Sequence, residues 1–69
     1  MNLQSAILYY LSGFDGGVSG TDLAPLAGCS RSQANKILAR LRLIGLVTQS
    51  NGLTARGELW CEQNFGRAA

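Results

Sequence analysis

The sequence predicts a mainly α-helical domain with one small β-hairpin. Apolar residues recur with helical spacing in four segments, and a serine or threonine suited to capping a helix precedes three of them. Asn51-Gly52, a dipeptide that favours the tight turn of a hairpin, lies between two short apolar runs. The chain has 69 residues, of which 46% are hydrophobic and 14% charged. We therefore expect one globular domain over residues 1–69.

The first helix is expected over residues 3–12. Its apolar residues share one side on the helical period, and they are Leu3, Ile7, Leu8 and Leu11. The glycines that follow end the helix and form a loop, namely Gly13, Gly16 and Gly17. Val18 is an isolated apolar residue after that loop, and we expect it to pair as a strand of one or two residues.

The second helix is expected over residues 21–27, "TDLAPLA". Ser19 and Asp22 have the spacing of a capping box, and Gly28 is placed to close the helix in the left-handed conformation. Pro25 lies past the first turn, where a proline removes a backbone hydrogen bond and clashes with the preceding turn. The helix is therefore expected to begin late, near Thr21 or Asp22, or to be bent.

The third helix is expected over residues 31–44 and begins with the stretch "SRSQANKILARL". Ser30 and Gln33 repeat the capping pattern, and Gly45 stops the helix. An apolar stripe about 100° wide should face the core. It consists of Ala34, Ile37, Leu38 and Leu41.

The hairpin and a last helix complete the predicted order. The runs "LVTQS" and "LT" flank the Asn51-Gly52 turn and would form the two strands. Thr54 can cap a helix over residues 55–65, which Gly66 ends. Three of its side chains are expected to face inward, and they are Leu59, Trp60 and Phe65.

The second and third helices together resemble a helix-turn-helix. Ala24 lies four residues before Gly28 in the turn, and small or apolar residues occupy the buried positions Leu23, Ala27, Cys29, Ala34 and Ile37. With "GLV" leading into a hairpin and "LTARG" leading out, residues 5–65 resemble the winged helix-turn-helix transcriptional regulators. The resemblance implies a winged helix-turn-helix fold, with helix 31–44 in the major groove of double-stranded DNA.

The resemblance also implies candidate DNA contacts. Residues suited to base edges lie opposite the apolar stripe, with Asn35 in the middle of that face; they are Ser32, Asn35, Lys36 and Ala39. Phosphates would be contacted by backbone amides after Ser30 and by the flanking residues Arg31, Gln33 and Arg40. Outside this helix the candidates are Asn51 at the hairpin tip and Arg56 just after the hairpin.

Several of these residues have a second interpretation. Gln33 only completes the helix cap, Arg40 pairs with Glu58 or Glu62, and the polar side of the helix is solvated surface. Leu43 stands where members of that family often carry a charged residue. It either covers the core or is exposed in an interface.

The charge of the chain is unevenly distributed. Between Asp22 and Glu58 there is no acidic residue and the local charge is +5, whereas the remainder sums to −3. A basic middle attracts phosphate, so a small sequence-specific DNA-binding protein that regulates transcription is the first functional hypothesis. The hairpin tip "QSNG" has no cation to hold a minor groove. This leaves a protein–protein interaction module without DNA binding as the alternative.

The composition argues against an enzyme. The chain has no histidine, its four acidic residues are scattered, and it has neither a glycine-rich phosphate loop nor a nucleophile clustered with a base. We therefore expect no catalytic residue, metal site, cofactor or small-molecule substrate.

The two cysteines and the apolar runs bear on location. Cys29 and Cys61 are expected to be buried thiols in a reducing cytoplasm, with a single disulfide as the alternative. No apolar run approaches the roughly eighteen residues of a membrane span, and the start "MNLQSAILYYL" lacks the basic leader of a signal peptide.

The aromatic residues of the first and last helices exceed what so small a core needs. They are Tyr9, Tyr10, Trp60 and Phe65. One face of these helices could pair across a two-fold axis, which predicts a homodimer. The alternative is that all four pack within one chain.

Overall fold

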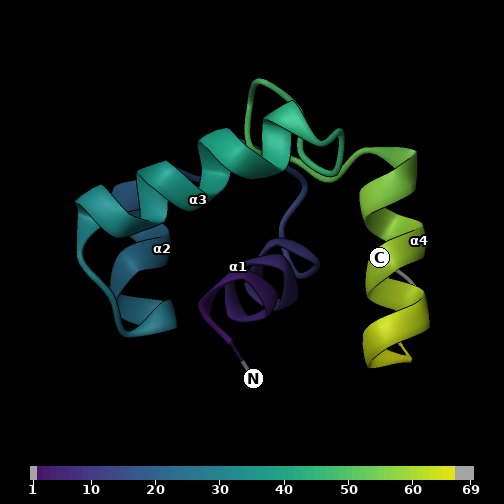
Figure 1. The fold of residues 1–69 in the computed structure, drawn as a ribbon, viewed down its shortest axis with the longest axis horizontal. Coiled ribbons are helices and arrows are strands. Elements are labelled where there is room, and N and C mark those ends of the chain that lie inside the picture. Colours follow the sequence, from purple (N-terminus) through teal and green to yellow (C-terminus); the bar gives the residue numbers. More distant parts are fainter. Residues whose placement is uncertain (1, 67–69) are drawn as a thin grey trace.

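Four helices account for most of residues 2–66, the part of the chain that the computed structural model describes (Figure 1). They are α1 (Leu3–Leu11), α2 (Gly20–Ala27), α3 (Arg31–Leu43) and α4 (Ala55–Phe65). α1 contacts the three other helices, α2 and α3 pack on each other, and α4 lies on the far side of α1 from α2 (Figure 1). None of the other helices therefore covers the outer side of α3. No helix of the described residues is long and apolar enough to cross a membrane.

The expected β-hairpin is not formed within residues 2–66. The winged helix-turn-helix fold predicted from the sequence is therefore wrong, and the described chain is a small all-helical domain. The only β pairing in this range is an isolated antiparallel bridge between Val47 and Leu53. The bridge closes the segment between α3 and α4, which we call the 46–53 loop.

The 46–53 loop holds one β bridge where two strands were expected. Gly45 ends the preceding turn with φ 83°, and Thr54 already caps α4. Between them the backbone is used by a turn: the Thr48 N–H donates to the Gly52 carbonyl at 2.7 Å, and the Asn51 N–H donates to the Thr48 carbonyl at 3.1 Å. Each side of the turn keeps one bridge residue, which does not make the alternating hydrogen-bonded ladder of a hairpin.

Val18 does not form the short strand that was expected. Its carbonyl accepts a hydrogen bond from the side chain of Asn51 at 2.8 Å, and the Gly17 N–H donates to the Ser50 carbonyl at 2.9 Å. The loop between α1 and α2 is thus tied to the 46–53 loop by single hydrogen bonds.

The predicted helix caps are confirmed. Ser19, Ser30 and Thr54 each accept a hydrogen bond from the backbone N–H three residues later, and the two serines form complete capping boxes. Gly28 and Gly66 follow α2 and α4 in the left-handed conformation, with φ 73° and 68°. Each of these signals is local to one helix end, which is why the sequence reveals it.

Some helix bounds differ from the prediction. α2 begins at Gly20 and continues through Pro25, because the Ser19 capping box fixes its first turn before the proline is reached. The late start expected for this helix is therefore wrong. α1 and α3 end at Leu11 and Leu43, each one residue earlier than expected.

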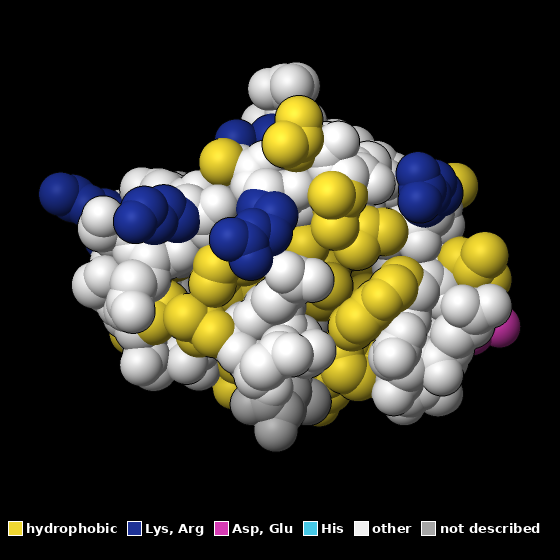
Figure 2. All heavy atoms as spheres, viewed as in Figure 1, with side chains coloured by type: hydrophobic (Ala, Val, Ile, Leu, Met, Phe, Trp, Pro, Cys, Tyr) yellow, Lys and Arg dark blue, Asp and Glu magenta, His cyan; other side chains and the backbone are white. Residues whose placement is uncertain are grey.

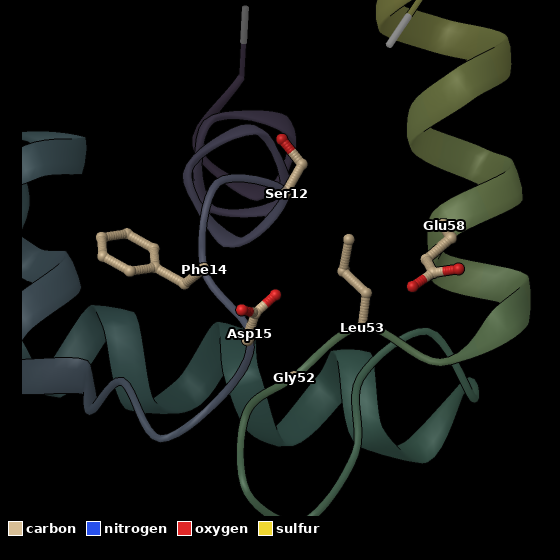
Figure 3. Close-up of a pocket in the computed structure, with 6 residues that line it drawn as sticks. All are labelled: Ser12, Phe14, Asp15, Gly52, Leu53 and Glu58. Atoms are coloured by element: carbon tan, nitrogen blue, oxygen red, sulfur yellow. The ribbon is translucent and has the colours of Figure 1, made fainter. Parts of the chain in front are cut away.

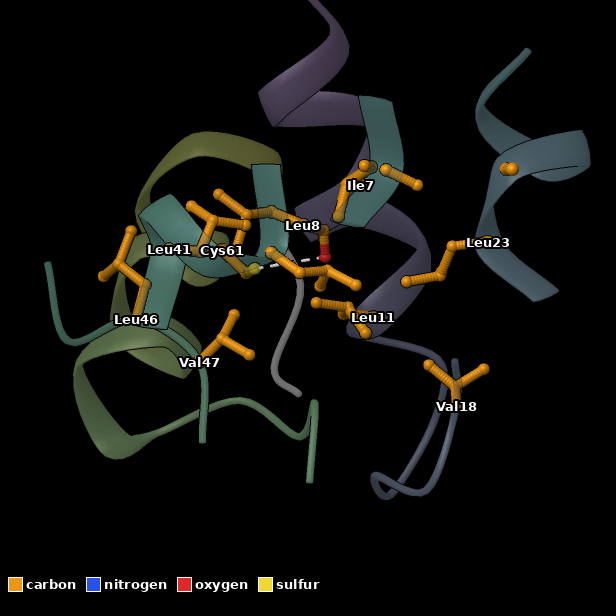
Figure 4. Close-up of a cluster of buried hydrophobic side chains, with 12 residues drawn as sticks. Ile7, Leu8, Leu11, Val18, Leu23, Leu41, Leu46, Val47 and Cys61 are labelled. Atoms are coloured by element: carbon orange, nitrogen blue, oxygen red, sulfur yellow. Dashed lines mark hydrogen bonds between the residues drawn. The ribbon is translucent and has the colours of Figure 1, made fainter. Parts of the chain in front are cut away.

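One apolar core joins the four helices (Figure 4). Its fully buried large side chains are Ile7, Leu8, Leu11, Leu23, Leu38, Leu41 and Cys61. The inward position on α4 belongs to Cys61, whose thiol donates to the Leu8 carbonyl at 3.6 Å, whereas Leu59 is 52% exposed and was wrongly predicted to face inward. Cys29 is half-buried in the α2–α3 turn and forms no disulfide with Cys61.

Gly57 allows α4 to approach the 46–53 loop closely. The residue is buried, and a Cβ at this position would overlap the carbonyl oxygen of Leu46. The Thr54 N–H donates to the same Leu46 carbonyl at 3.1 Å. These contacts set the rotation of α4 about its axis, so Cys61 faces inward one turn after Gly57 and Leu59 does not.

The aromatic side chains of α1 and α4 pack on one another. Tyr9 contacts Phe65 edge-on with ring centroids 5.4 Å apart, and Trp60 contacts Phe65 in the same way at 5.4 Å. Tyr10 lies against Tyr9 at 5.5 Å. The residues that motivated a homodimer are thus in contact within one chain, and the homodimer itself stays a prediction.

Candidate nucleic-acid interface

α3 presents a continuous outward face. Ala34, Leu38 and Leu41 are buried against the rest of the domain. On the helical period, the residues opposite the middle of this buried stripe are Ser32, Lys36, Ala39 and Leu43, and all four are exposed. We call these four residues the outward face. Leu43, for which the sequence left two readings, does not cover the core because it is 86% exposed.

Exposed cations lie along the edge formed by α3 and the start of α4. Arg31, Lys36 and Arg40 project from α3, and Arg56 projects from the first turn of α4. Figure 2 shows Lys and Arg side chains spaced along this edge, whereas the Asp or Glu side chain visible in that view lies at the outer side of α4. We call these four residues the basic row.

The acidic residues lie apart from the basic row. Asp15 and Glu58 line a depression of about 190 Å³ between the α1–α2 loop, the 46–53 loop and α4. Figure 3 shows them on either side of Leu53. The Asp22 carboxylate accepts the Ser19 N–H at 3.2 Å in the cap of α2. α3 itself carries no acidic residue, so nothing on this helix opposes an incoming phosphate.

Ser30 and Gln33 are occupied with each other. Gln33 Oε1 accepts the Ser30 N–H at 3.0 Å, and Ser30 Oγ accepts the Gln33 N–H at 3.1 Å. The reading in which Gln33 completes the helix cap is therefore confirmed. The other backbone amides of the exposed first turn of α3 remain able to bind an anion.

The sequence predicted Asn35 in the middle of the exposed face of this helix. In the structure Asn35 lies at the edge of the outward face instead. Gly20 at the start of α2 is buried, and a Cβ there would overlap the carboxamide of Asn35. The Asn35 side chain therefore rests against α2 while remaining exposed on its other side. Its position depends on a neighbour fifteen residues earlier in the chain, which helical periodicity cannot reveal.

Asn51 has an internal role. It is half-buried, its Oδ1 accepts from Arg42 Nη2 at 3.0 Å, and its Nδ2 donates to the Val18 carbonyl at 2.8 Å. Arg42 is half-buried as well, and its Nε is buried with no hydrogen-bond partner in the described part of the chain. Of the ten candidate DNA contacts, Asn51 is the one whose side chain joins two other segments of the domain.

Sequence reasoning missed Gln49. Gln49 is exposed on the 46–53 loop and lines a depression of about 370 Å³ together with Ala39, Arg42 and Leu43 of α3. A loop residue that comes beside a helix face leaves no periodic signal in the sequence. Leu43, in contrast, was already named from the sequence as a residue that either covers the core or is exposed in an interface.

The described residues contain no group of three or more His, Cys, Asp or Glu side chains that could hold a metal ion. No protein-family model matches the chain, and neither the curated proteins nor the solved structures include a match.

Proposed function

We propose that this protein binds double-stranded DNA through the outward face of α3 and acts as a small transcriptional regulator. The observation that carries the proposal is the basic row of Arg31, Lys36, Arg40 and Arg56 on one edge, within a stretch that has no acidic residue between positions 23 and 57. A one-sided field of this kind attracts the phosphate backbone and releases its counterions.

The dimensions of α3 suit a major groove. Its 13 residues extend over about 20 Å, and a helix diameter of about 10–12 Å fits a groove about 12 Å wide. Lys36 lies in the middle of the outward face and can reach a base edge, whereas Arg31 and Arg40 lie beside that face and can reach phosphates. Arg56 extends the row beyond α3, and the backbone amides after Ser30 offer one further phosphate contact.

Fluorescence anisotropy with a labelled duplex, measured over a series of salt concentrations, tests the proposal. We expect binding that weakens with salt along a log–log slope of about −2.7 to −3.6, since three or four neutralised phosphates contribute about −0.9 each. Selection from a pool of random duplexes then identifies the preferred site. Absence of binding at low salt would contradict the proposal.

A matched pair of variants separates the basic row from net charge. Arg40→Gln and Asn64→Asp each lower the net charge by one, but Asn64 is an exposed residue near the end of α4, two turns away from Arg56. We expect Arg40→Gln to weaken binding to all duplexes alike and to reduce the salt slope by about 0.9. Asn64→Asp should leave the slope unchanged. Equal effects of both variants would mean that net charge matters and the row does not.

A protein–protein interaction module is the second candidate function. The observation that favours it is the exposure of large apolar side chains, with Leu43 at 86%, Leu59 at 52% and Ile44 at 43%. Exposed apolar surface is typical of protein contacts when it is contiguous. A protein that is well folded but does not bind DNA at low salt would favour this candidate.

A further inference from the structure

Leu43 is exposed to a degree that the fold does not require. It is 86% exposed, whereas Leu38 and Leu41 on the same helix are fully buried. Burying a leucine side chain is one of the larger favourable terms available to so small a domain, and this one contributes almost nothing to the core. Its position at the end of the outward face places it where a partner of α3 would meet it.

The surroundings of Leu43 are apolar on one side and amide-bearing on the other. Ala39 lies one turn earlier on the same face, and Gln49 approaches from the 46–53 loop to line the same depression of about 370 Å³. Arg42 forms part of its wall, but its guanidinium is held by the hydrogen bond to Asn51 at 3.0 Å. The side chains available to a ligand in this depression are therefore two apolar groups and one carboxamide.

This combination matches the major-groove edge of one base pair. Thymine is the base that presents a methyl group there, which apolar side chains contact, and adenine presents N6 and N7, which a glutamine carboxamide pairs with in a bidentate manner. Guanine is most often read by an arginine or lysine, and the cation nearest to the depression, Arg42, is engaged by Asn51.

We infer that the depression formed by Ala39, Leu43 and Gln49 reads an A·T base pair, with the thymine methyl against the two apolar side chains and adenine against the carboxamide. The inference rests on the proposed function, because it requires α3 in the major groove. The basic row, three of whose four cations lie on the same helix, supplies the charge complementarity that selects DNA as the occupant of this surface. Ser32 and Leu43 are about 16 Å apart along the helix, which spans roughly five base pairs.

Replacing thymine by deoxyuridine tests the inference, because the exchange removes the methyl group alone. The wild-type protein is titrated against its selected site and against duplexes in which one thymine at a time is deoxyuridine. We expect one position at which affinity falls roughly fourfold, the value of one buried methyl group. In Leu43→Ala this position should no longer distinguish thymine from deoxyuridine. Gln49→Ala should lose discrimination of at least about fivefold at the same base pair.

Leu59→Ala is the matched control, because Leu59 is an exposed leucine of α4 outside this depression. It should keep the full response to deoxyuridine, and thermal melting should show that all three variants are folded. DNA binding without any response to deoxyuridine, or with the same response in Leu43→Ala, would overturn the inference and leave the proposed function intact. Absence of DNA binding at low salt would remove both.

Discussion

Arg42 Nη2 donates a 3.0 Å hydrogen bond to Oδ1 of Asn51, which places the end of α3 and the 46–53 loop under one constraint. The same carboxamide donates to the Val18 carbonyl at 2.8 Å, so the α1–α2 loop is joined to both. Asn51 has φ 63°, a left-handed conformation that asparagine tolerates better than most residues. One side chain therefore connects the α1–α2 loop to two segments that come much later in the sequence, the end of α3 and the 46–53 loop.

Substituting Asn51 should destabilise the domain through its hydrogen bonds more than through its backbone. Asn51→Gly keeps the left-handed conformation and loses both side-chain hydrogen bonds, so we expect the free energy of unfolding to fall by about 1–3 kcal/mol. Asn51→Ala adds about 1 kcal/mol because alanine disfavours that conformation. Urea unfolding measures both. A glycine variant as stable as the wild type would show that the two hydrogen bonds contribute nothing.

Two helical glycines should differ strongly in their response to alanine. Helix propensity alone predicts a gain of roughly 1 kcal/mol at each of them. At Gly57 the new methyl group would meet the backbone carbonyl of Leu46, which cannot move without shifting α4, so we expect a loss of about 2 kcal/mol or more. At Gly20 it would meet the end of the flexible Asn35 side chain, so stability should change by less than about 1 kcal/mol. Thermal and urea unfolding of the pair check the sign at each site.

The same truncation on two faces of α3 should separate folding from recognition. Leu38→Ala empties a fully buried position and should cost about 2–5 kcal/mol of unfolding free energy. Leu43→Ala truncates a side chain that is 86% exposed and should change stability by less than about 0.5 kcal/mol. Urea unfolding is the measurement. A large loss for Leu43→Ala would place that side chain in a contact that stabilises the free protein.

Gly20→Ala should imitate the loss of Asn35 in DNA binding. If Asn35 reads a base from the edge of the outward face, Asn35→Ala should cost about 1–3 kcal/mol on the selected site and relax its preference at one position. Gly20→Ala displaces the carboxamide without touching the DNA and should relax the same position. Binding to a panel of single-base variants of the site measures both.

The double variant completes this comparison. Its preference among the four base pairs at that position should be as strong as that of Asn35→Ala alone, because both substitutions act through one side chain. Relaxation at different positions, or additive losses, would show that Gly20 acts on DNA binding by another route.

Much of the helical structure could be predicted from local signals in the sequence. The caps at Ser19, Ser30 and Thr54 were predicted because the groups that form each cap lie within three residues of one another. The Asn51-Gly52 signal was correct that Asn51 adopts the left-handed conformation. It was wrong about the position of the turn and about the hairpin, because Gly52 does not share that conformation, the Asn51 N–H closes the turn on the Thr48 carbonyl, and only Val47 and Leu53 pair in the described chain.

Contacts between distant segments account for the rest. The close approach of Gly57 to Leu46 rotates α4 so that Cys61 is inward and Leu59 is exposed, and neither residue carries a sign of this in its own segment. In the candidate site, the cations of α3 follow from the sequence because the helix was predicted. The hydrogen bond from Asn51 to Val18 and the position of Gln49 beside α3 depend on where the 46–53 loop folds back. No local sequence pattern specifies that position.

The two cysteines allow the local opening of two parts of the domain to be measured without any substitution. Cys61 is enclosed in the core on α4, whereas Cys29 is half-buried in the turn between α2 and α3. Since the backbone of α4 lies close to α1 and not to α2 or α3 in the described chain, the two thiols sample openings of different parts of the domain. The rates at which a thiol reagent labels Cys29 and Cys61 would thus report the local opening of each part separately in one native protein. Slowing at Cys29 alone on addition of DNA would mean that the rigidity gained by α3 does not spread to α4.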